Sequence, residues 1–361
     1  MSAADRMLAI RAGARARAHI ARHGMQPADV AMIPAAAGGP KGLALIGLDK
    51  AIFCEWLPRT PRERWLLGAS IGAWRMAAAC RPDPARALDR LVDLYCDEQV
   101  YTERPPAIEV SEVCKRLVTR LLDGDDQAVL AHPHHRLAIL TVRGRGPLAH
   151  EHRASLLGWG LAAAANALGR RHLARLLERG VFATAAERVP FFRHRFDAFE
   201  NRVAALSRDN LHAALLASAS IPVVLRGVEG IAGAPAGTYW DGGLIDYQLA
   251  LPYAEAPDLV LYPHYIESIT PGWLDKPYRR RRATPSALDN VVTVGPSREF
   301  IAKLPNAKLP DRSDFKRYGT NAKARARAWR DVAEAGEELG HAFLRWCEKP
   351  DPAMVRGFGE S

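Results

Sequence analysis

The chain has 361 residues, of which 48% are hydrophobic and 25% are charged, and this balance excludes the disordered and fibrous classes. A formal charge of +10 favours anionic partners such as phospholipid headgroups or nucleic acid. The 5 cysteines are scattered without a C-x-x-C pair, so we predict reduced thiols in a cytosol rather than disulfides or a zinc site.

The N-terminal segment, residues 3–23, is basic and rich in alanine. Arginines interrupt any apolar core that a secretory signal would need, so we predict an exposed basic helix at the edge of the fold. An organelle transit peptide has a similar composition and stays open as the alternative. No apolar run approaches the roughly 18 residues of a membrane span, so we expect a cytoplasmic protein without a transmembrane segment.

The first part of the chain alternates strands with helices. Residues 30–36 are predicted to form a buried strand that runs into glycines, and residues 43–56 carry apolar residues at helical spacing. A second strand at 65–68 is followed by a helix at 71–80. This alternation predicts an α/β fold with a parallel sheet covered by helices.

The middle of the chain is predicted to be mainly helical, and the sheet is expected to continue to about residue 265. The helical region is 83–180, the further strands are 137–142, 221–225, 238–240 and 259–262, and a further helix is 211–219.

The C-terminal part carries four consecutive arginines, residues 279–282, in a segment that we predict to be a surface loop. A helix at 321–347 should dock through large apolar residues, which are Trp329, Leu339, Phe343, Leu344 and Trp346. Because we find no repeat or linker, we predict one domain over 1–361, with a core at 28–265 and a C-terminal extension at 266–361.

Ser70 lies in the sequence Gly-Ala-Ser-Ile-Gly, a G-x-S-x-G pattern between a predicted strand and a predicted helix. A nucleophile elbow needs small residues beside its serine, because the turn is tight and neighbouring strands come close. The N-terminus of the following helix points toward developing negative charge. Ser70 is therefore the predicted nucleophile, and a serine N-cap between incidental glycines is the structural alternative.

Residues 38–42 read Gly-Gly-Pro-Lys-Gly at the end of the first strand. Backbone N–H groups that no side chain covers can stabilise an oxyanion or cradle a phosphate. Because Pro40 has no N–H, the predicted oxyanion donors are Gly38 and Gly39, with Ile71 as a plausible third. An ordinary strand-to-helix turn is the structural alternative.

Lys41 and Gly42 are the predicted substrate-binding residues of this loop. Lys41 either fixes the loop or meets an anionic headgroup. It is followed by Gly42 and Leu43 rather than by Ser or Thr, so the spacing of a nucleotide P-loop is absent.

Asp241 begins the sequence Asp-Gly-Gly after the predicted strand 238–240. A carboxylate followed by two glycines can approach another loop closely and could accept the proton of Ser70. A hairpin turn is the alternative for this motif taken alone. Together, the loop, the elbow and Asp241 supply a stabiliser, a nucleophile and a base.

These motifs, in this order, resemble the patatin-like phospholipase family. That family has a glycine-rich loop G-G-G-x-[KR]-G, then G-x-S-x-G, A-S-x-x-I-P and D-G-[GA], which match residues 37–42, 68–72, 217–222 and 241–243. The likeness covers about residues 28–265. The first loop glycine is Ala37 here, and the Asn-Pro that often follows the last motif is replaced by Leu-Ile-Asp-Tyr.

The resemblance implies a three-layer α/β fold, with a mostly parallel central sheet flanked by helices, and a Ser70–Asp241 dyad without histidine. The implied activity is a serine hydrolase that cleaves ester-linked fatty acyl chains from phospholipids or related lipids, with no metal or other cofactor. The expected partners are the acyl-ester substrate and an anionic membrane contacted peripherally, and nucleic acid is not expected.

Other interpretations stay open from the residues alone. An esterase with a Ser-Asp-His triad would use a histidine after Asp241, and His264 is the leading candidate, with His341 the other. A non-catalytic basic protein could instead bind anionic lipid or nucleic acid. The histidines at 132, 134 and 135 are predicted to form a polar turn rather than a metal site.

Overall fold

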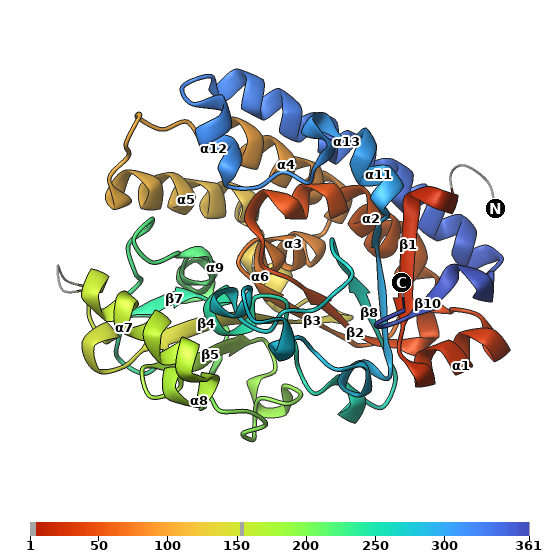
Figure 1. Ribbon diagram of the computed structural model, residues 1–361, viewed down its shortest axis with the longest axis horizontal. Coiled ribbons are helices and arrows are strands. Elements are labelled where there is room, and N and C mark those ends of the chain that lie inside the picture. The colour runs from red at the N-terminus through yellow and green to blue at the C-terminus, as the bar shows by residue number, and fades with distance from the viewer. Residues whose placement is uncertain (1–4, 152–154, 361) are drawn as a thin grey trace.

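The computed structural model describes residues 5–151 and 155–360 and is built around one ten-stranded sheet (Figure 1). The strand order is β10-β1-β9-β8-β2-β3-β4-β5-β6, and β7 pairs with β4 beside this path. The strands are β1 Leu8–Ala12, β2 Val30–Ala35, β3 Arg64–Ala69, β4 His135–Gly144, β5 Leu177–Ala183, β6 Asn201–Ala205, β7 Tyr239–Asp241, β8 Leu259–Pro263, β9 Val291–Pro296 and β10 Val355–Gly357.

Most neighbouring strands run parallel, and among the strands of the described residues only the pairs β1–β9, β4–β5 and β4–β7 are antiparallel. The central strands β2, β3 and β8 are buried along almost their whole length, as their continuous apolar sequences require. The predicted α/β fold with a mostly parallel sheet flanked by helices is therefore confirmed.

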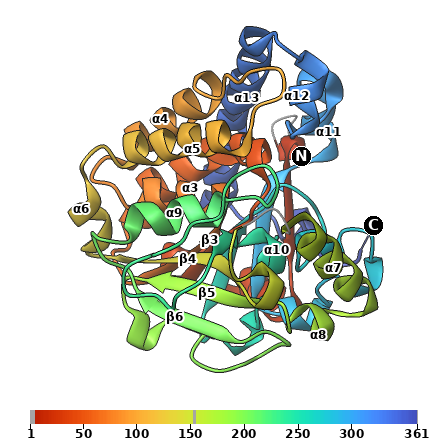
Figure 2. The ribbon, with the colours of Figure 1, turned by 90° about the vertical axis from the view of Figure 1, so that its left-hand side faces the viewer.

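The helices lie on both sides of the sheet (Figures 1 and 2). Helices α3, α4, α5, α9 and α13 stack together over one side, whereas α1 and α8 lie toward the other. The helices are α1 Ala14–His23, α2 Ile46–Lys50, α3 Ile71–Ala79, α4 Pro84–Asp97, α5 Ala107–Leu122, α6 Asp126–Leu130, α7 Ser155–Leu168, α8 Arg170–Leu173, α9 Leu211–Ala219, α10 Gly243–Asp246, α11 Arg298–Lys303, α12 Ser313–Tyr318 and α13 Ala322–Glu348.

The regularly patterned segments match their predictions. Strands β2, β3, β4, β7 and β8 and helices α3, α9 and α13 lie where the sequence predicts them. The segment predicted as a helix at 43–56 is helical, but it changes from 3₁₀ to α to π geometry along its length. Helix α13 buries four of its five predicted docking residues, Trp329, Leu339, Phe343 and Trp346.

The prediction of one helix over residues 3–23 is wrong in its first half. Residues 8–12 form β1, which pairs with β9 and β10, between a short 3₁₀ turn at Asp5–Met7 and α1; residues 3 and 4 lie outside the described residues. A charged residue such as Arg11 is typical of an exposed segment. Its guanidinium is instead buried and donates to the Gly357 and Glu360 carbonyls over 3.1 and 2.7 Å.

The prediction of a mainly helical region up to residue 180 is also wrong at its end, where β5 begins at Leu177. Two charged residues, Glu178 and Arg179, hide the strand pattern, although both are buried in the sheet. Arg179 pairs with Asp246 and Asp197 at 2.6 and 2.7 Å, which compensates for its burial.

Two further expectations about the sheet fail. Residues 221–225, predicted as a strand, form a turn in which Pro222 offers no N–H and Val223 has a φ of 71°. The sheet does not end near residue 265, because β9 inserts between β1 and β8. The pairing of β1 with β9 joins the N-terminal segment to the C-terminal part of the chain. Local sequence patterns do not reveal such a long-range contact.

The run of arginines at 279–282 lies in an irregular surface segment, with a short 3₁₀ turn at Arg279–Arg281. No helix within the described ranges, 5–151 and 155–360, has both the length and the apolar character needed to cross a bilayer.

Candidate active site

Ser70 occupies a sharp turn between β3 and α3. Its φ and ψ are 56° and −129°, a conformation that costs a residue with a Cβ about 1–3 kcal/mol. The turn also packs closely against β2, since a Cβ at Gly72 would lie 2.1 Å from the Ala35 carbonyl oxygen. A strained serine between a strand and a helix is the backbone geometry of a nucleophile elbow.

The register of β4 brings Ser70 and Asp241 together. Ala69, the last residue of β3, pairs with Leu140, and Asp241, the last residue of β7, pairs with Thr141. Because β3 runs parallel and β7 antiparallel to β4, their ends meet at adjacent positions of one edge. The Ser70 hydroxyl donates to Asp241 Oδ2 over 2.9 Å across a sequence separation of 171 residues.

The surroundings of Asp241 favour a basic carboxylate. Ser70 and Asp241 are only 5% and 6% exposed, and the Gly243 N–H donates to Asp241 Oδ1 over 2.7 Å. Burial raises the pKa of Asp241, while the charge of Arg312 and the hydrogen bonds from Gly243 and Ser70 lower it by less. A raised pKa makes the carboxylate a better acceptor for the serine proton.

The segment from Ser218 to Ser220 forms hydrogen bonds with both Ser70 and Asp241. Ser218 Oγ accepts from the Ser70 N–H over 2.8 Å and donates to the Leu140 carbonyl over 2.7 Å. The Asp241 N–H donates to the Ser220 carbonyl over 2.9 Å. The A-S-x-x-I-P motif is the one sign of this positioning role in the sequence.

The glycine loop lies beside Ser70. Gly38 and Gly39 have φ values of 151° and 57°, which favour glycine. A Cβ at Gly38 would lie 2.6 Å from the Tyr265 hydroxyl, which itself donates to the Ala37 carbonyl. Gly38, Gly39 and Ile71, the three residues predicted to supply amide donors, line the cavity that contains Ser70.

The structure separates the two predicted substrate-binding residues. Lys41 lines the cavity, whereas Gly42 is not among the lining residues. Gly42 instead allows close packing between the loop and α3, because a Cβ there would lie 3.0 Å from Ile71 Cγ1. A role for Gly42 in contacting substrate is therefore not supported by its position.

A buried ion pair fixes α2, the helix that follows the glycine loop. Arg75 Nε and Nη2 each donate over 2.6 Å to the carboxylate oxygens of Asp49, and both side chains are fully buried. Burial raises the pKa of Asp49, and the charge and hydrogen bonds of Arg75 oppose this rise. This pair ties α2 to α3, the helix that follows the nucleophile, and neither residue lies in a motif.

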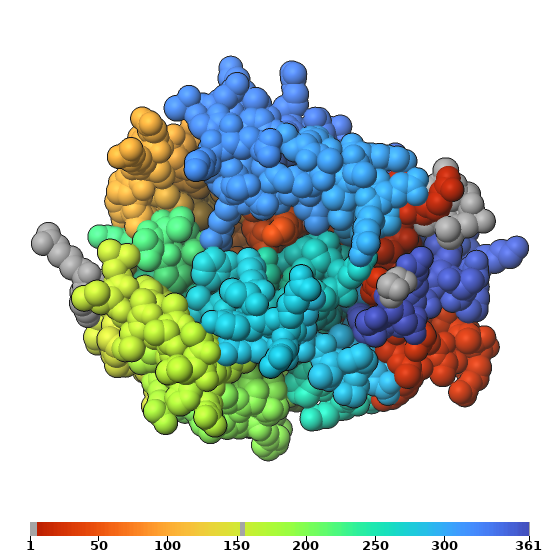
Figure 3. Space-filling model, in the orientation of Figure 1, coloured from red at the N-terminus to blue at the C-terminus, as the bar shows by residue number. Residues whose placement is uncertain are grey.

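Ser70 lies where two lobes of a cavity meet, one of about 600 Å³ and the other of about 610 Å³. Ser70, Ile221, Val224 and Arg312 line both. Figure 3 shows a hollow on this face between the C-terminal segment, in blue, and residues near 270, in cyan, with orange atoms from the early part of the chain at its floor.

Both lobes have a mostly apolar lining and also hold charged residues. The first lobe includes Trp74, Tyr95, Val110, Cys114, Leu117, Leu225 and Phe315, with the charged residues Glu103, Arg312 and Arg325. The second lobe contains three cations, Lys41, Lys276 and Arg312, and two acids, Asp241 and Asp311, and its lining also includes Trp159, Ala163, Tyr247, Trp273 and Leu274.

The positive charge of the second lobe affects the pKa of Tyr247. Burial alone would raise the pKa of this phenol, but the charges of Lys41 and Lys276 bring it below its usual value. Lys276 Nζ lies 4.2 Å from the centroid of the Tyr247 ring. The acid nearest in sequence to Arg312, Asp311, pairs with Lys308 at 3.0 Å. Lys276 and Arg312 lie in a C-terminal part without motifs, so no local sequence pattern indicates their place in this lobe.

His264 does not complete a triad in this structure. Its Nδ1 contacts the Ile266 carbonyl at 2.7 Å, and its buried Nε2 contacts no hydrogen-bonding group within residues 5–151 and 155–360. Burial lowers the pKa of His264 to about 4. His341 is exposed on α13. The carboxylate of Asp241 is instead satisfied by Ser70 and Gly243.

The three histidines at 132, 134 and 135 form a turn before and into β4. His132 Nδ1 accepts from the His134 and His135 N–H groups over 3.2 and 2.9 Å. Within the part of the chain that the structure describes, no group of three or more His, Cys, Asp and Glu side chains has the arrangement of a metal site.

The fold and the site define an α/β protein with a buried serine–aspartate pair at the junction of two cavity lobes. No protein-family model and no curated protein matches the chain. Among solved structures, it is similar to the crystal structure of VipD from Legionella pneumophila, with 13% sequence identity and a TM-score of 0.31. The similarity covers 65% of this chain and 50% of VipD, so the chain spans about half the length of that neighbour.

Proposed function

We propose that this protein is a serine lipid acyl hydrolase that cleaves ester-linked fatty acyl chains from phospholipids or related lipids. The observation that carries the proposal is the 2.9 Å hydrogen bond from Ser70 to a buried Asp241 at the junction of the two lobes. The four ordered motifs that resemble the patatin-like phospholipase family support the same conclusion.

In the proposed mechanism, Ser70 Oγ attacks the ester carbonyl while Asp241 takes its proton. The tetrahedral intermediate collapses, the bond to the leaving alcohol breaks, and Asp241 returns the proton to that alcohol. Water then loses a proton to Asp241 as it attacks the acyl-serine, and the proton passes to Ser70 as the fatty acid leaves. The same carboxylate serves both steps, so no histidine is required.

The backbone N–H groups of Gly38, Gly39 and Ile71 are the proposed donors to the oxyanion. The positive φ values at the two glycines and the start of α3 after Ser70 support this assignment. A single such donor contributes about 100- to 1,000-fold to the rate, because it is aimed at charge that develops only in the transition state.

The two lobes suggest how a phospholipid would be oriented. We assign the fatty acyl chain to the first lobe, whose lining is apolar and aromatic. The phosphate would then lie in the second lobe, near Lys41, Lys276 and Arg312, where positive charge gathers.

Labelling with a fluorophosphonate probe, followed by peptide mapping, tests this function directly. The probe should label Ser70, and Ser70→Ala should lose both the label and the hydrolysis of a p-nitrophenyl acyl ester. Ser111→Ala, which removes another buried serine hydroxyl, is the matched control and should keep both. Full ester hydrolysis by Ser70→Ala, or no labelling of the wild-type protein, would overturn the proposal.

A further inference from the structure

Helix α7 exposes a large apolar surface. Its sequence, Ser155–Leu168, contains no charged residue. Leu157 and Leu168 are 82% and 77% exposed, and Leu156 and Leu161 are also more than half exposed. Uncovered leucines gathered on one helix mark a binding surface rather than scattered surface residues.

Three of the four exposed leucines share one side of α7. Leu157, Leu161 and Leu168 are spaced four and seven residues apart, which places them along one face of a helix. The opposite side carries Ala162 and Asn166, both buried against the protein. Helix α7 therefore presents apolar side chains to the outside, and no element of the described residues covers them.

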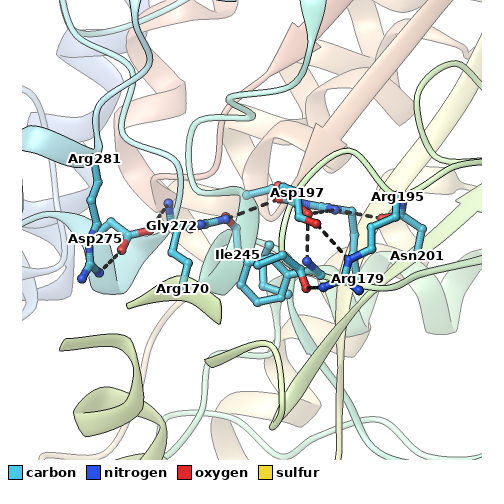
Figure 4. A network of polar contacts seen from close by, with 12 residues as sticks. Arg170, Arg179, Arg195, Asp197, Asn201, Ile245, Gly272, Asp275 and Arg281 are labelled. Carbon is cyan, nitrogen blue, oxygen red and sulfur yellow. Dashed lines mark hydrogen bonds and ion pairs between the residues drawn. The ribbon is translucent and has the colours of Figure 1, made fainter. Parts of the chain in front are cut away.

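A polar network holds α7 beside the segment from 272 to 282. Asn166 Nδ2 donates to Asp275 Oδ1 over 3.0 Å, and Arg281 donates to the Asn166 carbonyl over 2.8 Å. Arg170, which follows α7, and Arg281 both pair with Asp275 (Figure 4). The leucines of α7 and this segment are thus held in a fixed relation to each other.

The same segment carries unpaired positive charge next to the apolar helix. Arg281 is used in the network, but Lys276, Arg279, Arg280 and Arg282 form no ion pair with any carboxylate of the described residues. All four residues are exposed. In Figure 3, the yellow-green surface of α7 and the cyan surface of this segment lie on the same face.

This surface is continuous with the mouth of the second lobe. Trp159 and Ala163 of α7 line that lobe, as do Trp273 and Leu274 of the neighbouring segment. Trp273 is also 47% exposed, so one aromatic side chain belongs both to the cavity and to the outer surface. A ligand that enters the lobe from here passes between apolar and cationic groups.

We propose that α7 and residues 273–282 form a docking surface for an anionic lipid bilayer. The leucines would enter the boundary between headgroups and acyl chains, while the four cations would meet lipid phosphates, as in interfacial helices. The neighbouring cations and the net charge of +10 match a negatively charged surface, whereas a second copy of this basic chain would repel them. The surface lies on the bilayer and brings the second lobe against it.

Cosedimentation of the full chain with lipid vesicles tests the proposal. The protein should bind vesicles of phosphatidylcholine and phosphatidylglycerol, and should bind vesicles of phosphatidylcholine alone more weakly. Added salt should weaken binding to the anionic vesicles, because it screens the arginines. Failure to bind the anionic vesicles at low salt would overturn the proposal.

Two sets of variants separate the apolar from the cationic contribution. The double variant Leu157→Ser, Leu161→Ser should bind anionic vesicles about 100-fold more weakly, since each leucine transferred from water contributes about tenfold. The triple variant with Arg279→Gln, Arg280→Gln and Arg282→Gln should lose about fivefold for each arginine and should show a weaker salt dependence. Unchanged binding in both sets would contradict the proposal.

Matched controls lie on other faces of the molecule. Ile108→Ser removes an aliphatic side chain, 43% exposed, from α5, and Arg327→Gln with Arg345→Gln removes charge from α13. These variants should bind vesicles like the wild-type protein. Light scattering provides a second check, because leucine variants that dissociate an oligomer without losing vesicle binding would assign α7 to a second copy of the chain and overturn the proposal.

Docking and catalysis can fail separately. Ser70→Ala should bind vesicles as the wild-type protein does, and the leucine variants should hydrolyse a short soluble ester at the wild-type rate. Vesicle binding without ester hydrolysis by the wild-type protein would refute the proposed activity alone. Ester hydrolysis without vesicle binding would refute the docking surface alone.

Discussion

Ser218 Oγ accepts a 2.8 Å hydrogen bond from the backbone N–H of Ser70. The same hydroxyl donates to the Leu140 carbonyl, so one buried side chain joins the strained turn to β4 next to the position where β7 ends. Ser218 thus satisfies the Ser70 N–H, which the sharp turn leaves without a backbone partner in the sheet. Ser218 is a positioning residue for the proposed nucleophile.

Replacing Ser218 by alanine should lower both stability and activity. The Ser70 N–H would be buried without a partner, at a cost of about 2 kcal/mol in the free energy of unfolding. Release of the turn should also lower kcat/KM for a p-nitrophenyl ester by about 10- to 100-fold, because a displacement of about 1 Å at a reacting group has this effect. Urea unfolding and ester kinetics measure the two effects.

Ser111→Ala is the control for this comparison. Ser111 is also buried, accepts a 2.8 Å hydrogen bond from the Arg226 N–H and donates to the Ala107 carbonyl, but it is not among the residues that line the cavity. It should lose similar stability and keep its kcat/KM. Equal losses of activity in both variants would show that Ser218 acts only through general stability.

Asp241→Asn should abolish activity and stabilise the fold. Asparagine can still accept from Gly243, but it cannot take the proton of Ser70, so kcat should fall by about 1,000-fold or more. Burial raises the pKa of Asp241 in the folded state, so the stability linked to this group is present below the usual carboxyl pKa and is lost as the pH rises through the folded value. At neutral pH the variant should therefore unfold at a higher temperature. A lower Tm would contradict this.

Arg312 should set the acidic limb of the pH–rate profile. Its charge lowers the pKa of Asp241, and the reaction needs Asp241 ionised. Arg312→Ala should therefore move the acidic limb of kcat/KM to higher pH, whereas Arg312→Lys, which keeps the charge, should leave it near the wild-type position. An unchanged limb in Arg312→Ala would show that another group controls the acidic side.

The sequence was sufficient to predict Ser70 and Asp241 because each lies in a local pattern with a steric reason. The serine needs glycines on both sides of a tight turn, and the aspartate needs glycines that let it approach. Their contact, however, depends on pairing partners at Leu140 and Thr141, which no local pattern specifies. The sequence suggests that Asp241 accepts the proton of Ser70, and the resemblance of the ordered motifs adds that the two act as a dyad without histidine.

The sequence was insufficient where charge is compensated by distant residues. Glu178 and Arg179 look like surface residues until the structure shows Arg143, Asp246 and other partners around them. Lys276 and Arg312 enter the second lobe from a segment that lacks periodicity or motifs. Most predictions that rest on apolar spacing succeed here, apart from the strand expected at 221–225, whereas those that need partners far along the chain do not.

Asp275→Asn should weaken the junction between α7 and the neighbouring segment. Asp275 is buried, yet the charge of Arg170 and the hydrogen bonds from Arg281 and Asn166 outweigh the effect of burial and lower its pKa. The variant leaves these partners without a charge to bind, so it should lose about 3 kcal/mol of unfolding free energy at neutral pH. Glu299→Gln, in an exposed pair with Arg6, should lose less than about 1 kcal/mol.

The pH dependence of this loss gives a second check. Because the folded pKa of Asp275 is lowered, its contribution is present above the usual carboxyl pKa and disappears as the pH falls through the folded value. The difference between wild-type and Asp275→Asn should therefore shrink at acidic pH. A difference that is constant with pH would assign the loss to packing rather than to charge.

Filling the first lobe should change the preference for acyl-chain length. Leu117→Phe adds volume to the apolar lining of that lobe, whereas Ala163→Phe adds volume to the second lobe. If the acyl chain lies in the first lobe, Leu117→Phe should lower kcat/KM for a long-chain p-nitrophenyl ester by about tenfold relative to the acetyl ester, since a few lost apolar contacts discriminate to this extent. Ala163→Phe should leave the ratio unchanged. A chain-length effect confined to Ala163→Phe would reverse the assignment of the two lobes.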